Sequence, residues 1–319
     1  MKEKTSFLRR HKKDFLAGLI VFLIALPLCL GIAQASQAPL FSGIVAGVIG
    51  GVVIGFLSKS NLSVSGPAAG LVAIVIVAIE QLGAFNIFLC AVMIAGAIQL
   101  ILGLLKAGSI ASYFPSNVIE GMLAGIGLTI IIKELPNALG HNTGSAGLPD
   151  AEDGFVFADI TASLQQIEPA AIIIAITGIV ILGLWQSRGF KKLQMIPAGL
   201  LVVVVGTLIN EGFKLSGSAL YMGTSYLVNL PIPTSARDFF GQFSLPDFSG
   251  MANPEVWKTG IVIAIVASIE TLLCIEATDK LDPLKRNTSG NAELRAQGIG
   301  NMVSGFIGGL PITSVIVRS

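Results

Sequence analysis

The sequence predicts an all-α polytopic membrane protein, and three observations support this fold class. Hydrophobic residues make up 53% of the 319 residues, while charged residues make up only 12%. A soluble domain carries roughly 25% charged residues, so a large soluble core does not explain this deficit. The chain also contains repeated apolar runs of about 20 residues, the length that crosses a bilayer. Glycine is abundant at 37 residues, which suits helices that pack closely in lipid.

Seven apolar segments qualify as spanning helices. They are residues 14–35, 41–58, 84–105, 115–134, 169–186, 194–210 and 256–277. Two further segments, 66–80 and 296–310, are shorter or more polar and have Gly and Pro nearby. Loops 36–40 and 278–297 are expected to be solvated connections on opposite sides of the membrane.

The basic residues predict the orientation of these spans. Six Lys and Arg side chains precede the first span, at Lys2, Lys4, Arg9, Arg10, Lys12 and Lys13. The connection 137–168 is acidic. Because cytoplasmic loops are enriched in Lys and Arg, we expect residues 1–13 to be cytoplasmic and 137–168 to lie outside. The expected location is therefore the inner cell membrane, with multiple passes through the lipid bilayer.

Two interrupted segments predict half-helices. Residues 61–67, Asn-Leu-Ser-Val-Ser-Gly-Pro, indicate an extended stretch that enters the membrane and starts a helix partway through it. Pro67 suits the first helical turn and Ser65 suits the N-cap. Residues 308–319 again combine a Gly-Gly-Leu-Pro break with a β-branched run. Two such breaks in corresponding places are typical of inverted-repeat transporters with a site at the membrane midplane.

The first break has the composition of an anion site. The small residues of this break leave the first-turn N–H groups bare, and these donors lie at the positive end of a helix dipole. The residues concerned are Ser65, Gly66, Pro67, Ala68, Ala69 and Gly70. The alternative interpretation is a tight turn that only allows close helix packing.

Arg318, between Val317 and Ser319, is a second candidate for anion binding. An arginine that ends an apolar run in a membrane protein is costly and is commonly functional, here as a fixed positive charge. The alternative is an interfacial arginine whose head group reaches water.

Glu270 is the candidate coupling residue. It lies inside the apolar run 261–274, where a carboxylate can gain and lose a proton. The alternative is a structural carboxylate paired with a neighbouring helix. We expect Cys29, Cys90 and Cys274 to be apolar packing residues.

Other kinds of function find no support in the sequence. A net charge of +1 gives no basis for nucleic-acid binding. No phosphate-binding loop, nucleophile elbow or metal box is present, so we expect no enzyme activity, no cofactor and no metal site.

Four stretches resemble the sulfate permease (SulP) family. Residues 268–279, Ser-Ile-Glu-Thr-Leu-Leu-Cys-Ile-Glu-Ala-Thr-Asp, resemble its eighth transmembrane helix. Residues 290–301, Gly-Asn-Ala-Glu-Leu-Arg-Ala-Gln-Gly-Ile-Gly-Asn, are similar to its Asn-x-Glu-Leu-x-x-Gln-Gly-x-x-Asn stretch. Residues 309–319 resemble its approach to the tenth helix, and 65–67 resemble the start of its third.

The resemblance implies a fold of seven plus seven inverted helices, with a core and a gate domain. The anion would bind between the N-termini of helices three and ten and move by an elevator-type mechanism. Leu28 and Ile32 on helix one would line the pocket. Residues 14–319 would be an incomplete transmembrane domain, with the C-terminal helices and a STAS domain absent, and the full-length protein would be a homodimer.

The resemblance also implies a substrate class and a coupling mode. Sulfate or bicarbonate is the expected anion, and Leu28 after Pro27 is more similar to the bicarbonate-transporting branch. Ala68 and Cys274 stand where a sodium site would need hydroxyls, which favours proton coupling or exchange over sodium symport. The remaining alternatives are a nucleobase carrier of the same fold and an anion channel.

Overall fold

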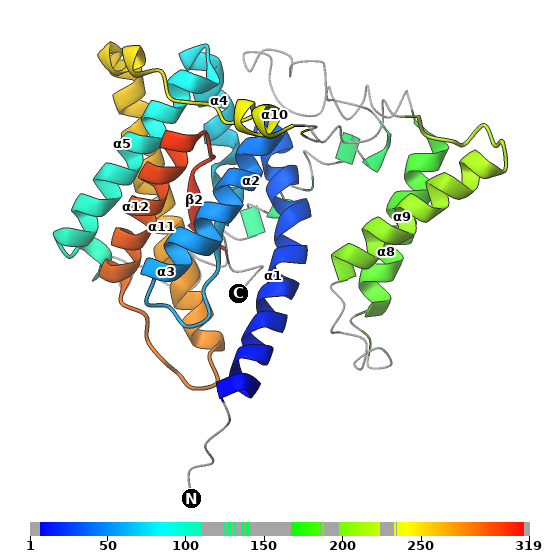
Figure 1. Cartoon of the computed structure of the whole chain (residues 1–319), viewed down its shortest axis with the longest axis horizontal. Coiled ribbons are helices and arrows are strands. Elements are labelled where there is room, and N and C mark those ends of the chain that lie inside the picture. Colours follow the sequence, from blue (N-terminus) through cyan, green and yellow to red (C-terminus); the bar gives the residue numbers. More distant parts are fainter. Residues whose placement is uncertain are drawn as a thin grey trace, which may run out of the picture. The chain divides into compact units, whose positions relative to one another are not determined.

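The computed structural model describes residues 7–109, 167–185, 198–223 and 235–315, with isolated residues between these ranges (Figure 1). Most of the expected span 115–134 lies outside the described residues, as do Val317, Arg318 and Ser319. The chain forms two compact units. Unit 1 comprises Met1–Ile24 and Gly127–Leu230, and unit 2 comprises Ala25–Ile126 and Pro231–Ser319.

Helix α1 (Phe7–Ala35) starts in unit 1, ends in unit 2 and continues through Pro27. In the described part of unit 1, the further helices are the neighbours α8 (Pro169–Trp185) and α9 (Ala198–Leu215). The segment 169–186, expected to span the membrane, forms an apolar helix of 17 residues over 169–185. In the expected span 194–210 the helix α9 is described from Ala198, and it continues past 210 through the polar residues Glu211 and Lys214. A helix needs only one apolar face, so its end is poorly marked by hydropathy.

Unit 2 contains the remaining elements, beginning with a helix in three parts. These are α2 (Leu40–Ile49), the π-helical segment η1 (Gly50–Ile54) and α3 (Gly55–Leu57). The helix ends there, and the chain continues through strand β1 (Ser65–Pro67) and the 3₁₀ turn η2 (Ala69–Leu71) into helix α4 (Val72–Leu82). The later elements are α5 (Phe85–Leu104), α10 (Ala236–Gly241), the 3₁₀ turn η6 (Phe248–Ala252), α11 (Pro254–Leu281), α12 (Gly290–Ile307) and strand β2 (Ile312–Ser314).

Local sequence explains where several of these helices begin and end. Gly83 and Gly308 end α4 and α12 with φ angles of 74° and 91°, in the left-handed region that glycine adopts without strain. Asn253 caps the start of α11 through its side chain and is followed by proline, the residue that best tolerates the first helical position.

Helices α5, α11 and α12 pack side by side in unit 2 (Figure 1). Their contact depends on glycine. A side chain at Gly298 of α12 would meet the backbone of Leu100 and Gly96 of α5, and one at Gly260 of α11 would meet Ile94. Small residues at such crossings let helix backbones approach closely, as they do in membranes.

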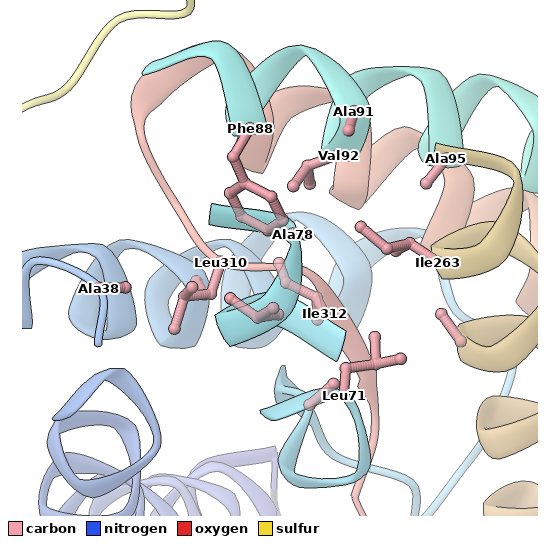
Figure 2. Close-up of a cluster of buried hydrophobic side chains, with 14 of the residues drawn as sticks. Ala38, Leu71, Ala78, Phe88, Ala91, Val92, Ala95, Ile263, Leu310 and Ile312 are labelled. Atoms are coloured by element: carbon pink, nitrogen blue, oxygen red, sulfur yellow. The ribbon is translucent and has the colours of Figure 1, made fainter. Parts of the chain in front are cut away.

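The buried hydrophobic cluster of unit 2 includes residues that follow β1 and residues that lead into β2. Figure 2 shows Phe88 of α5, Ile263 of α11 and Ile312 of β2 in this cluster, together with Leu71 and Leu310. The start of α4 and the start of β2 are therefore fixed in the hydrophobic core rather than on the surface.

The outer faces of the helices are apolar. Among the described residues, four helices are long and apolar enough to cross a membrane: Ala17–Ala35, Leu40–Leu57, Phe85–Leu104 and Pro254–Leu281. Phe22, Ile101 and Val262 on these helices are exposed. Contiguous exposed apolar surface on long helices is typical of contact with lipid.

Candidate functional site

The two interrupted segments meet as a short antiparallel strand pair in unit 2. Ser65 pairs with Ser314, Gly66 with Thr313, and Pro67 with Ile312. Two further hydrogen bonds extend the pairing, since the Ala68 N–H donates to the Pro311 carbonyl at 3.0 Å and the Val315 N–H donates to the Val64 carbonyl at 2.8 Å. The extended conformation predicted for 61–67 is confirmed for residues 65–67, and residues 312–314 of the second break are extended as well.

The helix after β1 starts without a side-chain cap. The side chains of Ala68, before η2, and Leu71, before α4, accept no capping hydrogen bond, while the Leu71 N–H donates to the Ala68 carbonyl at 3.3 Å. The prediction that Ser65 is the N-cap and Pro67 lies in the first helical turn is wrong. Both residues are in β1, because they pair with a strand from the far end of the chain, which local sequence does not reveal.

The strand pair has two faces with different neighbours. Because successive side chains of a strand point to opposite sides, Ser65 and Ser314 share one face, while Gly66 and Thr313 share the other. The serine face contacts Gln297 of α12. On the other face, the Thr313 hydroxyl lies beside the carboxylate of Glu270.

Glu270 of α11 is buried and weakly hydrogen-bonded. Its Oε1 accepts the Gly70 N–H at 3.4 Å, and its Oε2 has no hydrogen-bond partner among the described residues. A methyl group built on Gly70 would lie 3.0 Å from the carboxylate atoms of Glu270. The salt bridges found among the described residues do not include Glu270. The structure therefore places this carboxylate directly against the uncapped turn before α4.

The remaining candidate residues are the three cysteines, Leu28 and Ile32 of α1, and residues 317–319. Cys274 is buried one turn beyond Glu270 on α11, and Cys29 and Cys90 are also buried and reduced. Leu28 and Ile32 on α1 are half-buried, and Ile32 packs against the central cluster. Their predicted role in lining an anion pocket stays a prediction, as does that of residues 317–319.

Three polar residues of α12 were not recognised as part of the site. Glu293, Gln297 and Asn301 are fully buried and follow one another at intervals of four, so they share one helix face. The interpretation of 278–297 as a solvated connection is wrong from residue 290 onward, because α12 begins there. In the sequence, polar residues at intervals of four within a segment of small and apolar residues indicate a helix with one polar face, and this spacing is the signal that points to the three residues.

Asn301 binds β2 through both ends of its amide. Its Oδ1 accepts the Ile312 N–H at 2.6 Å, while its Nδ2 donates to the Ile312 carbonyl at 3.0 Å and to Oε1 of Gln99 at 2.7 Å. Ser304 donates to the Leu310 carbonyl at 2.7 Å. Helix α12 thus holds the chain that leads into β2 at several points.

An uncapped helix start, paired with a second extended break and lying beside a buried carboxylate, defines a class of membrane protein. That class is the integral membrane proteins with broken helices at a central site. The chain belongs to the sulfate permease family, whose model matches residues 11–319. The family and the all-α membrane fold predicted from sequence are confirmed.

Individual proteins with similar sequences are consistent with this family. The chain is 28% identical over 312 residues to the protein YvdB of Bacillus subtilis (strain 168), covering 98% of this chain and 56% of that protein. It is 27% identical over 314 residues to the bicarbonate transporter BicA of Picosynechococcus sp. (strain ATCC 27264 / PCC 7002 / PR-6), covering 95% and 51%. The chain therefore spans about half the length of the curated relatives it matches.

A solved structure shares this fold. The transmembrane domain of a cyanobacterial bicarbonate transporter BicA superposes with a TM-score of 0.74 at 24% sequence identity, covering 98% of this chain and 76% of that one. At this identity the similarity concerns the fold, and function has to be argued from the site.

Proposed function

We propose that the protein carries an inorganic anion, sulfate or bicarbonate, across the membrane by secondary active transport. The observation that supports this most directly is the turn at Ala69–Leu71, which starts a helix beside the strand pair without a side-chain cap. The positive end of a helix dipole attracts an anion without any charged side chain, and the Gly70 N–H of this turn points at a carboxylate, the Oε1 of Glu270.

The anion site in this proposal has two sides. Residues 65–70 form the β1 side, at the positive end of the helix that follows. The continuation of β2, with Val317, Arg318 and Ser319, supplies the other side, and Arg318 adds a fixed positive charge. Leu28 and Ile32 of α1 complete the lining. The pairing of β1 with β2 supports this arrangement, because it brings the two interrupted segments together.

Glu270 is the proposed coupling residue. Its carboxylate accepts the Gly70 N–H, so a change in its charge acts directly on the turn that receives the anion. A sodium ion at this position would find the Thr313 hydroxyl but no hydroxyl at Ala68 or Cys274. We therefore propose proton coupling or exchange rather than sodium symport, with unit 2 as the body that moves in an elevator-type cycle.

The membrane orientation belongs to the same proposal. We propose an inner-membrane protein with a cytoplasmic N-terminus, because the basic residues cluster before the first span. We also propose that it works as a homodimer.

The test is uptake by the full product of the gene in proteoliposomes. Labelled sulfate and labelled bicarbonate are offered under imposed proton or sodium gradients, with labelled uracil as the competing nucleobase substrate. Uptake of either anion that is driven by a proton gradient, lost in Glu270→Gln and reduced in Arg318→Ala, is the expected result.

The matched control is Glu255→Gln, which neutralises an exposed carboxylate on the same helix that pairs with Lys258 on the surface. It is expected to transport as wild type. Sodium-dependent uptake that survives Glu270→Gln would contradict the coupling proposal, and uptake of uracil instead of either anion would contradict the substrate proposal.

A further inference from the structure

A second buried carboxylate lies on the opposite face of the strand pair from Glu270. Glu293 of α12 is fully buried and accepts three hydrogen bonds. The donors are the Ser58 hydroxyl beyond α3, the Gln297 amide at 3.0 Å and the Ser314 hydroxyl at 3.2 Å. Buried carboxylates are costly unless such donors surround them, and here the donors come from three separate parts of unit 2.

Gln297 connects this carboxylate to both strands. Its Nε2 donates to the Ser65 hydroxyl at 2.7 Å and lies 3.2 Å from the Ser314 hydroxyl. Ser65 and Ser314 are direct partners across the pair. One amide group therefore contacts β1, β2 and Glu293 at the same point.

The strands are too short to fix their own register. Each has three residues, and a ladder of this length is marginal without other contacts. A slip of one residue would turn Thr313 toward α12 and Ser314 toward Glu270, because neighbouring side chains point to opposite faces. It would also move the chain by roughly 3.3 Å along the strand, which would misplace the helix start that follows.

We propose that Glu293 and Gln297 form a clasp that sets the register of β1 against β2 and so positions the anion-binding turn. Both are positioning residues that do not touch the anion. The inference rests on the proposed function, because the turn that the clasp positions is the one proposed to bind sulfate or bicarbonate.

The clasp differs from Glu270 in a way that suits this role. Glu293 is held by three donors, whereas Glu270 has one long hydrogen bond and one oxygen without a partner among the described residues. Both carboxylate oxygens of Glu293 accept hydrogen bonds, although the Gln297 Oε1 has no partner among the described residues, and donors that converge on a buried carboxylate hold it in one geometry. The two faces of the strand pair therefore separate a fixed carboxylate from one that is available for coupling.

The test replaces Gln297 by glutamate, which keeps its shape, removes both amide donors and sets a carboxylate against Glu293. Gln81→Glu is the control, because it makes the same change on the exposed side of α4. Hydrogen exchange of the Ala68 and Val315 amides reports the strand pairing, since both donate across it. Transport of labelled sulfate and bicarbonate gives KM and Vmax.

In Gln297→Glu we expect exchange at Ala68 and Val315 to accelerate at least about tenfold, with the amides of α5 unchanged. KM for the transported anion should rise by about tenfold or more, with a smaller change in Vmax. The exchanged pair Glu293→Gln with Gln297→Glu restores a donor opposite an acceptor and should recover most of the protection. Gln81→Glu should match wild type in every measurement.

Three outcomes would overturn the clasp. They are unchanged exchange at Ala68 and Val315, faster exchange throughout α5 and α11, and failure of the exchanged pair to recover protection. If Gln297→Glu does not fold, Gln297→Met removes the donors without adding charge and is tested in the same way. If the wild-type protein carries neither anion, the proposed function fails, but hydrogen exchange still decides whether the clasp exists.

Discussion

Replacing Asn301 by leucine tests whether buried hydrogen bonds hold β2 against α12. Leucine is branched at the same carbon as asparagine and has a similar size, so the change removes polarity with little change in packing. Three hydrogen bonds disappear, and the Ile312 N–H, the Ile312 carbonyl and Oε1 of Gln99 lose their Asn301 partner. All three residues involved are fully buried, so no solvent replaces the lost partner.

The expected loss follows from counting these groups. A buried donor or acceptor left without a partner costs about 1–3 kcal/mol, so three of them lower the free energy of unfolding by about 3 kcal/mol or more. The comparison is Asn253→Leu, which removes the exposed N-cap of α11 and its single bond to the Glu255 N–H at 3.0 Å. Loss of such a cap costs about 1 kcal/mol.

The assay is unfolding of the detergent-solubilised protein by heat and by denaturant, followed by circular dichroism. Asn301→Leu should lower both midpoints by more than Asn253→Leu does. If the two variants are equally stable, or if Asn301→Leu matches wild type, then these bonds do not hold β2 and the reasoning is refuted.

Two further predictions concern the site and the loop after α11. Gly70→Ala should abolish anion uptake without loss of expression, because its methyl group would lie 3.0 Å from the Glu270 carboxylate, whereas Gly51→Ala, with nothing within 4 Å, should transport as wild type. Hydrogen bonds from Arg286 hold the pKa of Asp282 at about 2, below the value of about 3.9 in an unfolded chain. A lowered folded-state pKa stabilises the fold above pH 3.9, and this contribution is lost as the pH falls through about 2. Asp282→Asn should therefore reduce protection of the Arg286 amide by a constant factor at neutral pH, and the difference from wild type should shrink as the pH falls through about 2 and vanish below it. A difference that persists in full below that pH would contradict the assignment.

Much of the fold could be predicted because it depends on local composition. Long apolar runs and a low charged fraction specify membrane helices wherever they occur, since the bilayer supplies the apolar surroundings. The breaks at 61–67 and 308–314 are visible because proline, glycine and β-branched residues act on their own stretch of backbone. The burial of Glu270 follows from its apolar neighbours along one helix.

The partners of these residues could not be predicted, because they lie far away along the chain. Ser58 and Glu293 are 235 residues apart, and Gly70 and Glu270 are 200 apart, yet each pair is in contact. The residues next to Ser65 predict a helix cap, whereas its pairing with Ser314 places it in a strand. Its hydroxyl accepts a hydrogen bond from the Gln297 amide instead of capping a helix. Polar residues in the first turns of α12, such as Glu293 and Gln297, suggest a solvated loop as long as their buried partners in other parts of the chain are unknown.

The sequence by itself determined that this is a membrane protein of packed helices with two extended breaks, because hydropathy and backbone preference are properties of neighbouring residues. Only the tertiary structure decided that the breaks pair with each other, that Glu270 and Glu293 lie on opposite faces of the pair, and that Gln297 joins both strands. The physical reason is that hydrogen bonds and burial depend on distance in space, which the folded chain sets and the order of residues does not display.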